Sequence, residues 1–151
     1  MRCFSRLSII TCAFLCLFYV QVGAVIQVEK GVRVGYYEES RDGFFGVDAK
    51  FNLLNISVNP NFEWVFVDDG DLFTLNLDGF IDLGTFPLVN TWVGAGYGLI
   101  YTKPEVKDSQ TDYAFNLIAG AGLSLPLDPY LMIKLVVMDN SSFVVAGGIR
   151  F

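Results

Sequence analysis

Apolar and polar residues alternate along most of this chain, which is the pattern of β-strands whose two faces meet different surroundings. The alternation is clearest over residues 72–83. One face there carries Phe73, Leu75, Leu77, Gly79, Ile81 and Leu83, and the other carries Thr74, Asn76, Asp78, Phe80 and Asp82. No stretch has a competing helical period, so the pattern predicts an all-β fold.

Eight such segments follow one another, separated by turn residues such as Asp42-Gly43 and Asn59-Pro60-Asn61. A change of phase near Leu53-Leu54 is interpreted as a β-bulge within one strand. Most segments are about 9–13 residues long, whereas strands of soluble proteins usually have about 5–6 residues and membrane-spanning strands about 9–11. We therefore predict an eight-stranded antiparallel up-and-down transmembrane β-barrel with strands at 28–38, 44–58, 62–67, 72–83, 91–101, 112–125, 130–138 and 142–151.

The face opposite the apolar one is charged and polar, and we assign it to the barrel interior. Eight strands enclose a space that side chains can fill, and buried charges must be paired. We therefore predict an internal ion-pair network with four acids against four bases: Arg33, Asp48, Lys50, Glu63, Asp78, Asp82, Lys134 and Arg150. The glycines at positions 94, 96, 98, 120, 122 and 148 are expected to make room for the long cationic side chains.

The first 24 residues differ from the rest of the chain. Arg2 and Arg6 precede an apolar run over residues 7–20, and small residues follow at 22–24. This arrangement predicts a cleaved secretory signal peptide at 1–24, with the barrel domain at 25–151. Cys16 invites comparison with a lipoprotein signal, but the bulky residues before it do not fit one.

Composition excludes several classes of function. All three cysteines lie in the predicted signal peptide and the chain has no histidine, so the barrel domain has no thiol or imidazole for catalysis or metal binding. Removal of the signal peptide changes the formal charge from −6 to −8, and an acidic chain without basic patches argues against nucleic-acid binding. No cofactor is expected.

The last strand closes on an aromatic residue. Residues 142–151 read S-F-V-V-A-G-G-I-R-F, with Phe143, Val145, Ile149 and Phe151 on one face. This ending resembles the C-terminal signature of bacterial outer-membrane β-barrels, and the whole pattern resembles the small eight-stranded barrels of the OmpA/OmpX and opacity-protein type. The resemblance implies insertion into the outer membrane, with both termini on the periplasmic side and Phe151 as the signal for the barrel assembly machinery.

Aromatic residues and loop charges extend this hypothesis. We expect an outer aromatic ring of Tyr36, Phe45, Phe73, Tyr101, Tyr113 and Phe143, and an inner ring of Phe62, Trp92, Tyr130 and Phe151. Trp92 fits the inner ring poorly, because its phase directs it inward. The outer loops are short and acidic, with Glu38, Glu39, Asp42, Glu105, Asp108, Asp112 and Asp139. Contact with lipopolysaccharide through divalent ions is one interpretation, and simple solvation of the carboxylates is the other. The expected assembly is a monomer in outer-membrane lipid.

Two acidic groups are weak candidates for chemistry. Asp78 and Asp82 share a face four residues apart, which makes a paired-carboxylate site conceivable. The turn Asp68-Asp69-Gly70-Asp71 offers hard oxygens for a cation but lacks the spacing of an EF-hand, and a solvated turn is favoured. The leading hypothesis is a non-enzymatic barrel with a structural, envelope or surface-interaction role. The alternatives are a barrel enzyme, a narrow pore, and a soluble secreted β-barrel or sandwich that binds a ligand.

Overall fold

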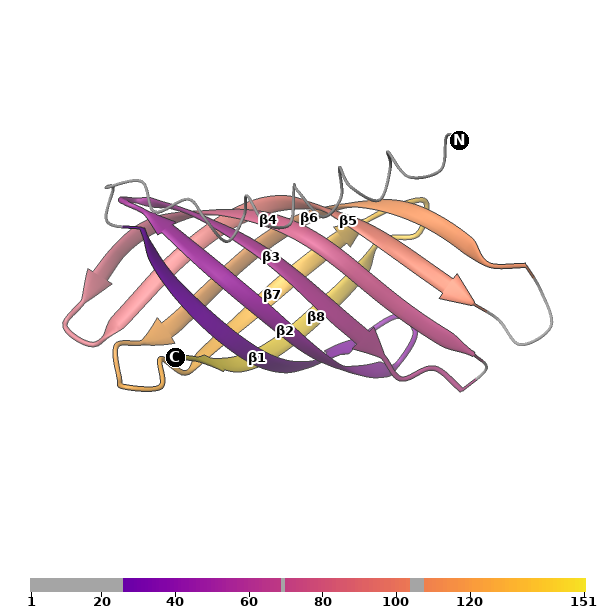
Figure 1. Cartoon of the computed structure of the whole chain (residues 1–151), viewed down its shortest axis with the longest axis horizontal. Helices are drawn as coiled ribbons and strands as arrows, with labels where there is room; N and C mark the ends of the chain where they lie inside the picture. Colours follow the sequence, from indigo (N-terminus) through magenta and orange to yellow (C-terminus); the bar gives the residue numbers. More distant parts are fainter. Residues whose placement is uncertain (1–25, 69, 104–107) are drawn as a thin grey trace, which may run out of the picture.

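The computed structural model describes residues 26–68, 70–103 and 108–151, and it forms one closed antiparallel barrel (Figure 1). The predicted signal peptide and Glu105 lie outside the described residues. The strands are β1 (Gln27–Tyr37), β2 (Asp42–Leu53), β3 (Ile56–Val65), β4 (Asp71–Phe86), β5 (Val89–Lys103), β6 (Gln110–Leu123), β7 (Tyr130–Val137) and β8 (Ser142–Arg150). Each strand pairs with its neighbours in sequence, and β1 pairs with β8. The predicted eight-stranded up-and-down topology is confirmed.

The barrel has two different ends, and the strands cross its long axis at a slant (Figure 1). We call the end where β1 begins and β8 finishes the basal end, and the opposite end the distal end. The turns at 54–55, 87–88 and 124–129 lie at the basal end, and those at 38–41 and 138–141 lie at the distal end. Strand lengths are uneven, because β4 has 16 residues and β7 has 8.

The second predicted turn is in the wrong place. Asn59-Pro60-Asn61 lies inside β3, and the chain reverses instead at Leu54-Asn55, where Leu54 has a φ of 56°. The predicted bulge near Leu53 is therefore a hairpin turn, which explains why the phase changes there. Pro60 pairs with Leu77 of β4, but the β2–β3 ladder is interrupted between Asp48↔Asn61 and Phe51↔Val58. Proline has no N–H to donate to the ladder, so a local interruption is its expected effect.

The hairpin of β4 and β5 is longer than predicted. Both strands run past the predicted boundaries, and only residues 87–88 form the turn between them. The register shifts between Asp82 and Gly84, where Gly84 takes a φ of 136° that a residue without Cβ adopts freely. The hairpin therefore extends the basal rim on one side of the barrel.

The two faces of the strands have opposite chemistry. Along β4, Leu75 and Leu77 are 56% and 58% exposed, whereas Thr74, Asn76 and Asp78 are buried. The same alternation recurs on every strand. The outer surface is thus apolar and the interior polar, the reverse of a soluble barrel.

Candidate functional site

Glu63 is the centre of the polar interior. Its carboxylate is fully buried and forms salt bridges with Arg33 Nη2 at 2.7 Å and Lys134 Nζ at 2.8 Å. Tyr37 Oη and Thr74 Oγ1 also donate to Glu63 Oε2, at 2.6 and 2.9 Å. Three strands besides β3 (β1, β4 and β7) thus supply four donor side chains to one carboxylate, so Glu63 links strands on opposite sides of the barrel.

A second charged group lies nearer the basal end. Asp48 Oδ2 accepts from Arg150 Nε at 3.3 Å and from Asn59 Nδ2 at 2.8 Å, and Tyr130 Oη donates to Asp48 Oδ1 at 3.2 Å. The Arg150 guanidinium lies 4.0 Å from the centre of the Tyr130 ring and 5.5 Å from that of Trp92. These contacts join β2, β3, β5, β7 and β8, so they link strands on both sides of the seam between the first and last strands.

Asparagine side chains connect the two charged groups. Asn61 lies between them: it accepts from Arg33 and from Asn76, the latter at 2.9 Å, and donates to Asp78 at 2.7 Å. Asn116 donates to Asp78 at 3.1 Å from β6. Among the described residues no cation forms a salt bridge with Asp78, and the side-chain hydrogen bonds that stabilise its carboxylate come from the amides of Asn61 and Asn116.

The predicted ion-pair residues divide into three sets. Arg33, Glu63 and Lys134 meet in one group, and Asp48 and Arg150 meet in another. Lys50 is buried with its ammonium 5.8 Å from the Trp92 ring centre, and Asp78 contacts only amides, so neither shares in a salt bridge of the described residues. The eighth residue, Asp82, is not inside the barrel.

Asp82 is exposed at the basal rim, which corrects the prediction for this residue. The physical reason is that β3 begins at Ile56, opposite Ile81. Beyond Ile81, β4 therefore has no β3 partner and is paired on one side only. Asp82 instead donates its backbone N–H to Asn55 in the β2–β3 turn, at 3.0 Å. The buried charges are therefore four cations, Arg33, Lys50, Lys134 and Arg150, against three acids, Asp48, Glu63 and Asp78. Half-buried Glu29, which pairs in register with Lys50, supplies a fourth acid near the rim.

Apolar side chains close the interior above and below the polar groups. The distal cap consists of buried residues near the distal ends of their strands: Tyr37, Phe44, Val65, Ala114, Val136 and Val144. Towards the basal end, Trp92 packs between Phe80 and Tyr130, with ring centres 6.4 and 6.0 Å apart. The salt-bridged group around Glu63 thus lies between two layers of buried apolar and aromatic side chains, and Lys50 and Arg150 contact the layer around Trp92.

The interior glycines make room for side chains, but none of the six predicted glycines has a lysine or arginine side chain among the atoms nearest to an added Cβ. A Cβ at Gly120 would lie 2.5 Å from the Trp92 ring, and one at Gly148 would lie 2.8 Å from Tyr130. Long cations are accommodated instead by Gly31, next to Arg150, and by Gly46, next to Arg33. Glycine is therefore paired with the bulkiest lumen residues, which is how large side chains fit inside a narrow barrel.

Sequence reasoning missed several interior residues. Ser57, Asn59 and Asn61 are buried in the lumen. The sequence places Ser57 near the end of the strand predicted at 44–58 without marking it as an interior residue, and Pro60 makes Asn59 and Asn61 resemble turn residues. Alternation through the proline, from Ser57 to Glu63, is the sequence feature that could have identified them. Tyr37 and Tyr130 were also missed as interior ligands of carboxylates.

The predicted aromatic rings are only partly found. Trp92 and Tyr130 face the lumen, and Phe62 lies well along β3, where it stacks on Phe73 at 5.7 Å. The prediction is therefore wrong for these three members of the inner ring. Trp92 and Tyr130 follow the inward phase of their strands, and Phe62 is displaced because β3 begins earlier than expected. A row of aromatic side chains crosses the outer surface near the distal end, from β2 to β5. Each is the register partner of the next: Phe45, Trp64, Phe73 and Tyr101.

The described residues offer few groups for metal or acid–base chemistry. No cluster of three or more His, Cys, Asp or Glu side chains that could hold a metal ion occurs among them. Asp69 of the acidic turn lies outside the described residues. Asp78 and Asp82 are not brought together, because one is buried and the other exposed. In the described part of the chain, no helix has the length and apolar character needed to cross a membrane.

Comparison with known proteins finds similarity in structure alone. No family model and no curated protein sequence matches the chain. The N-terminal β-barrel domain of Pseudomonas aeruginosa OprF superimposes with a TM-score of 0.68 at 13% identity, covering 82% of this chain and 96% of that one. Neisserial surface protein A gives 0.62 at 13% identity, covering 83% and 94%. Ail, the attachment invasion locus protein of Yersinia pestis, gives 0.51 at 15% identity, covering 83% and 97%.

These similarities extend over nearly the whole length of the solved chains, and they agree with the closed β-barrel fold described above. At such low identity they carry the fold and no shared activity. This chain therefore has the fold of the small eight-stranded outer-membrane β-barrels.

Proposed function

We propose that this protein is an integral outer-membrane β-barrel with a structural or surface-interaction role and without enzymatic activity. The observation that carries the proposal is the inverted distribution of residues, with apolar side chains on the outside and charges within. Side chains such as Tyr97, Leu131 and Val34 are 60–73% exposed on the outer face of regular strands. A soluble monomer rarely exposes a continuous apolar surface of this kind, whereas a bilayer buries it.

The closed interior supports a structural role over a pore. The distal cap and the layer around Trp92 lie on either side of the charged groups, and the lumen side chains of both layers are buried. Ions need a continuous hydrated path, and these two layers interrupt it. We expect the protein to produce no discrete conductance steps in a planar bilayer. Regular steps in the picosiemens to nanosiemens range, lost on unfolding, would favour the pore.

The arrangement of titratable groups supports the absence of catalysis. Glu63 and Asp48 are engaged by several donors each and are closed off from substrates, while Asp82 is isolated at the rim. General acid–base catalysis needs a group within reach of a bound substrate. The described interior provides structural ion pairs in place of such a group.

The proposed partners follow from location in the outer membrane. Phe151 lies on the outward face at the end of β8 and is 63% exposed, a position where assembly machinery can contact it. The acidic residues of the distal turns, including Glu38, Glu39 and Asp139, are exposed and available to divalent ions bound to lipopolysaccharide. We propose a monomer, because the interior is complete within one chain.

The test is heat-modifiable migration of the refolded chain. Residues 25–151 are refolded into detergent micelles, and the same chain is diluted into plain buffer as the control. We expect a strand-rich circular dichroism spectrum in detergent and faster migration of the unheated sample in SDS gels. A chain that folds in plain buffer and migrates identically with and without heating would instead be a soluble barrel.

A further inference from the structure

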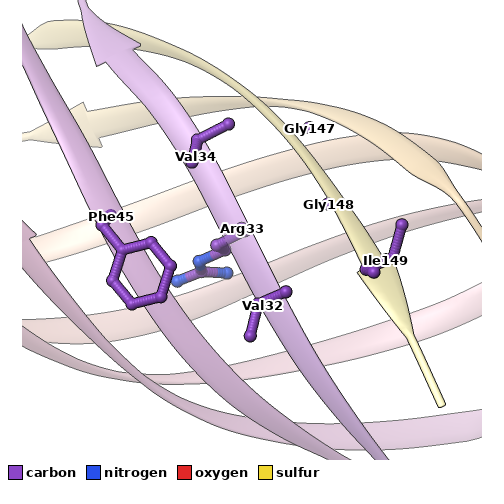
Figure 2. Close-up of a pocket in the computed structure, with 7 residues that line it drawn as sticks. All are labelled: Val32, Arg33, Val34, Phe45, Gly147, Gly148 and Ile149. Carbon is purple, nitrogen blue, oxygen red and sulfur yellow. The ribbon is translucent and has the colours of Figure 1, made fainter.

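A shallow groove of about 290 Å³ lies on the outer face of the barrel where β1 meets β8 (Figure 2). Val32, Val34, Phe45 and Ile149 surround it, and Gly147 forms a notch because it has no side chain. In register, Gly147 lies between Val34 of β1 and Leu131 of β7. Arg33 is behind the groove, with its guanidinium bonded to Glu63 inside the barrel.

A single cation lies next to this groove on the same face. Lys30 precedes Val32 by two residues on β1, so its side chain also points outward, and it is exposed. Among outward-facing positions of the eight described strands, the other charged residues, Asp71 and Lys103, lie at the distal end and are partners in register. No carboxylate of the described residues forms a salt bridge with Lys30.

The spacing of cation and groove fits one amphipathic molecule. At about 3.4 Å per residue, Lys30 lies about 7 Å along the strand from Val32 and about 14 Å from Val34. With a strand tilt of about 45°, the second distance is about 10 Å of membrane depth, within the half-thickness of about 15 Å of hydrocarbon. A headgroup at Lys30 therefore places its acyl chain along the notch at Gly147.

We propose that this seam binds an anionic phospholipid of the periplasmic leaflet, with its phosphate at Lys30 and one acyl chain in the groove. The inference rests on the proposed function, because it requires the basal end to face the periplasmic side of a membrane. Charge and shape each contribute: the ammonium selects an acidic headgroup, and the notch accepts a chain that a filled surface would exclude. The lipid covers the strand pair that closes the barrel.

The experiment is native mass spectrometry of the refolded barrel in mild detergent. Phosphatidylglycerol and phosphatidylethanolamine with identical acyl chains are added in equal amounts. One lysine near the membrane surface strengthens the binding of an anionic lipid by about fivefold. We therefore expect the unsubstituted protein to retain about fivefold more phosphatidylglycerol than phosphatidylethanolamine. Lys30→Gln should abolish the preference, whereas Lys103→Gln, at the distal end, should leave it intact.

Gly147→Leu tests the groove separately. A Cβ at Gly147 would lie 3.1 Å from the end of the Leu131 side chain, which can move, so the variant should fold and retain less of both lipids. Retention unchanged in Gly147→Leu, or a preference that survives Lys30→Gln, would overturn the lipid site. A dimer mass that Gly147→Leu removes would assign the groove to a second copy of the chain.

Heat-modifiable migration of each variant separates this proposal from the proposed function. If the unsubstituted protein does not show a folded, detergent-dependent band, the membrane barrel itself is rejected. If that band is present in every variant and no lipid preference is measured, only the lipid site is rejected.

Discussion

Replacing Glu63 with glutamine should be among the most damaging conservative substitutions in this protein. The side chain keeps its shape, and one oxygen remains to accept from Tyr37 and Thr74. The negative charge is lost, however, with Arg33 Nη2 and Lys134 Nζ only 2.7 and 2.8 Å away. Both cations are buried, and breaking a buried ion pair by removing one partner costs about 3–5 kcal/mol.

Urea titration of the barrel in lipid vesicles, followed by tryptophan fluorescence, measures this loss. For an unfolding slope of about 2 kcal/mol per molar urea, a loss of about 4 kcal/mol moves the midpoint by about 2 M. Asp82→Asn is the matched control, since it removes a carboxylate that is exposed at the rim. We expect a change of no more than about 0.5 kcal/mol for this control.

The double variant Glu63→Gln/Lys134→Leu separates charge from packing. If the buried ammonium causes the loss, removing Lys134 as well should give a coupling of about 1–3 kcal/mol relative to the two single variants. Lys134→Leu alone should cost less than Glu63→Gln, because Arg33 remains paired with Glu63. The reasoning is refuted if Glu63→Gln is as stable as Asp82→Asn.

Two further substitutions test the packing and pairing of the barrel. Gly120→Val should destabilise the barrel by about 1–3 kcal/mol or prevent folding, because a Cβ there would lie 2.5 Å from the Trp92 ring. The control is Gly79→Ala on the outer face, where the nearest atom to an added Cβ is Ala95 O at 3.7 Å. Equal urea midpoints for the two variants would contradict the packing argument. Pro60→Val should raise the urea midpoint, because a restored N–H can rejoin the interrupted β2–β3 ladder. An unpaired backbone group in a bilayer costs several kcal/mol. This cost exceeds the ~0.4–1 kcal/mol that proline contributes to stability by restricting the unfolded chain. Slower amide exchange around Ala49 and Lys50 should accompany the higher midpoint, and a lowered midpoint with unchanged exchange would argue against a missing bond.

The strand count and the inward or outward direction of most residues were predictable, because period-two alternation is a local property of the chain. Arg33, Glu63 and Arg150 were assigned to the interior on phase alone, and the structure places them there. The β3 boundaries were missed, since the strong turn propensity of Asn59-Pro60-Asn61 outweighed the alternation that continues through this segment. In the barrel, two neighbouring strands hold this segment extended, and tertiary pairing overrides local preference.

The pairing of charges inside the barrel could not be predicted from phase. Which acid meets which base depends on strand register, and register is set by turn positions that were misplaced by several residues around Leu54. In the observed register, Asp82 lies at the rim and Glu63 faces both Arg33 and Lys134. Aromatic residues posed a related difficulty, because an inward Trp92 and an outward Trp64 differ in sequence only by the phase of their strand.

The uneven strand lengths have a consequence for the surrounding bilayer. At about 3.4 Å per residue and a tilt of about 45°, the 8 residues of β7 rise about 19 Å, whereas the 16 residues of β4 rise about 38 Å. A hydrocarbon core of about 30 Å exceeds the first height and is exceeded by the second. Lipids beside β7 and β8 should therefore be compressed relative to those beside β4 and β5, and the barrel axis should lean to reduce the mismatch.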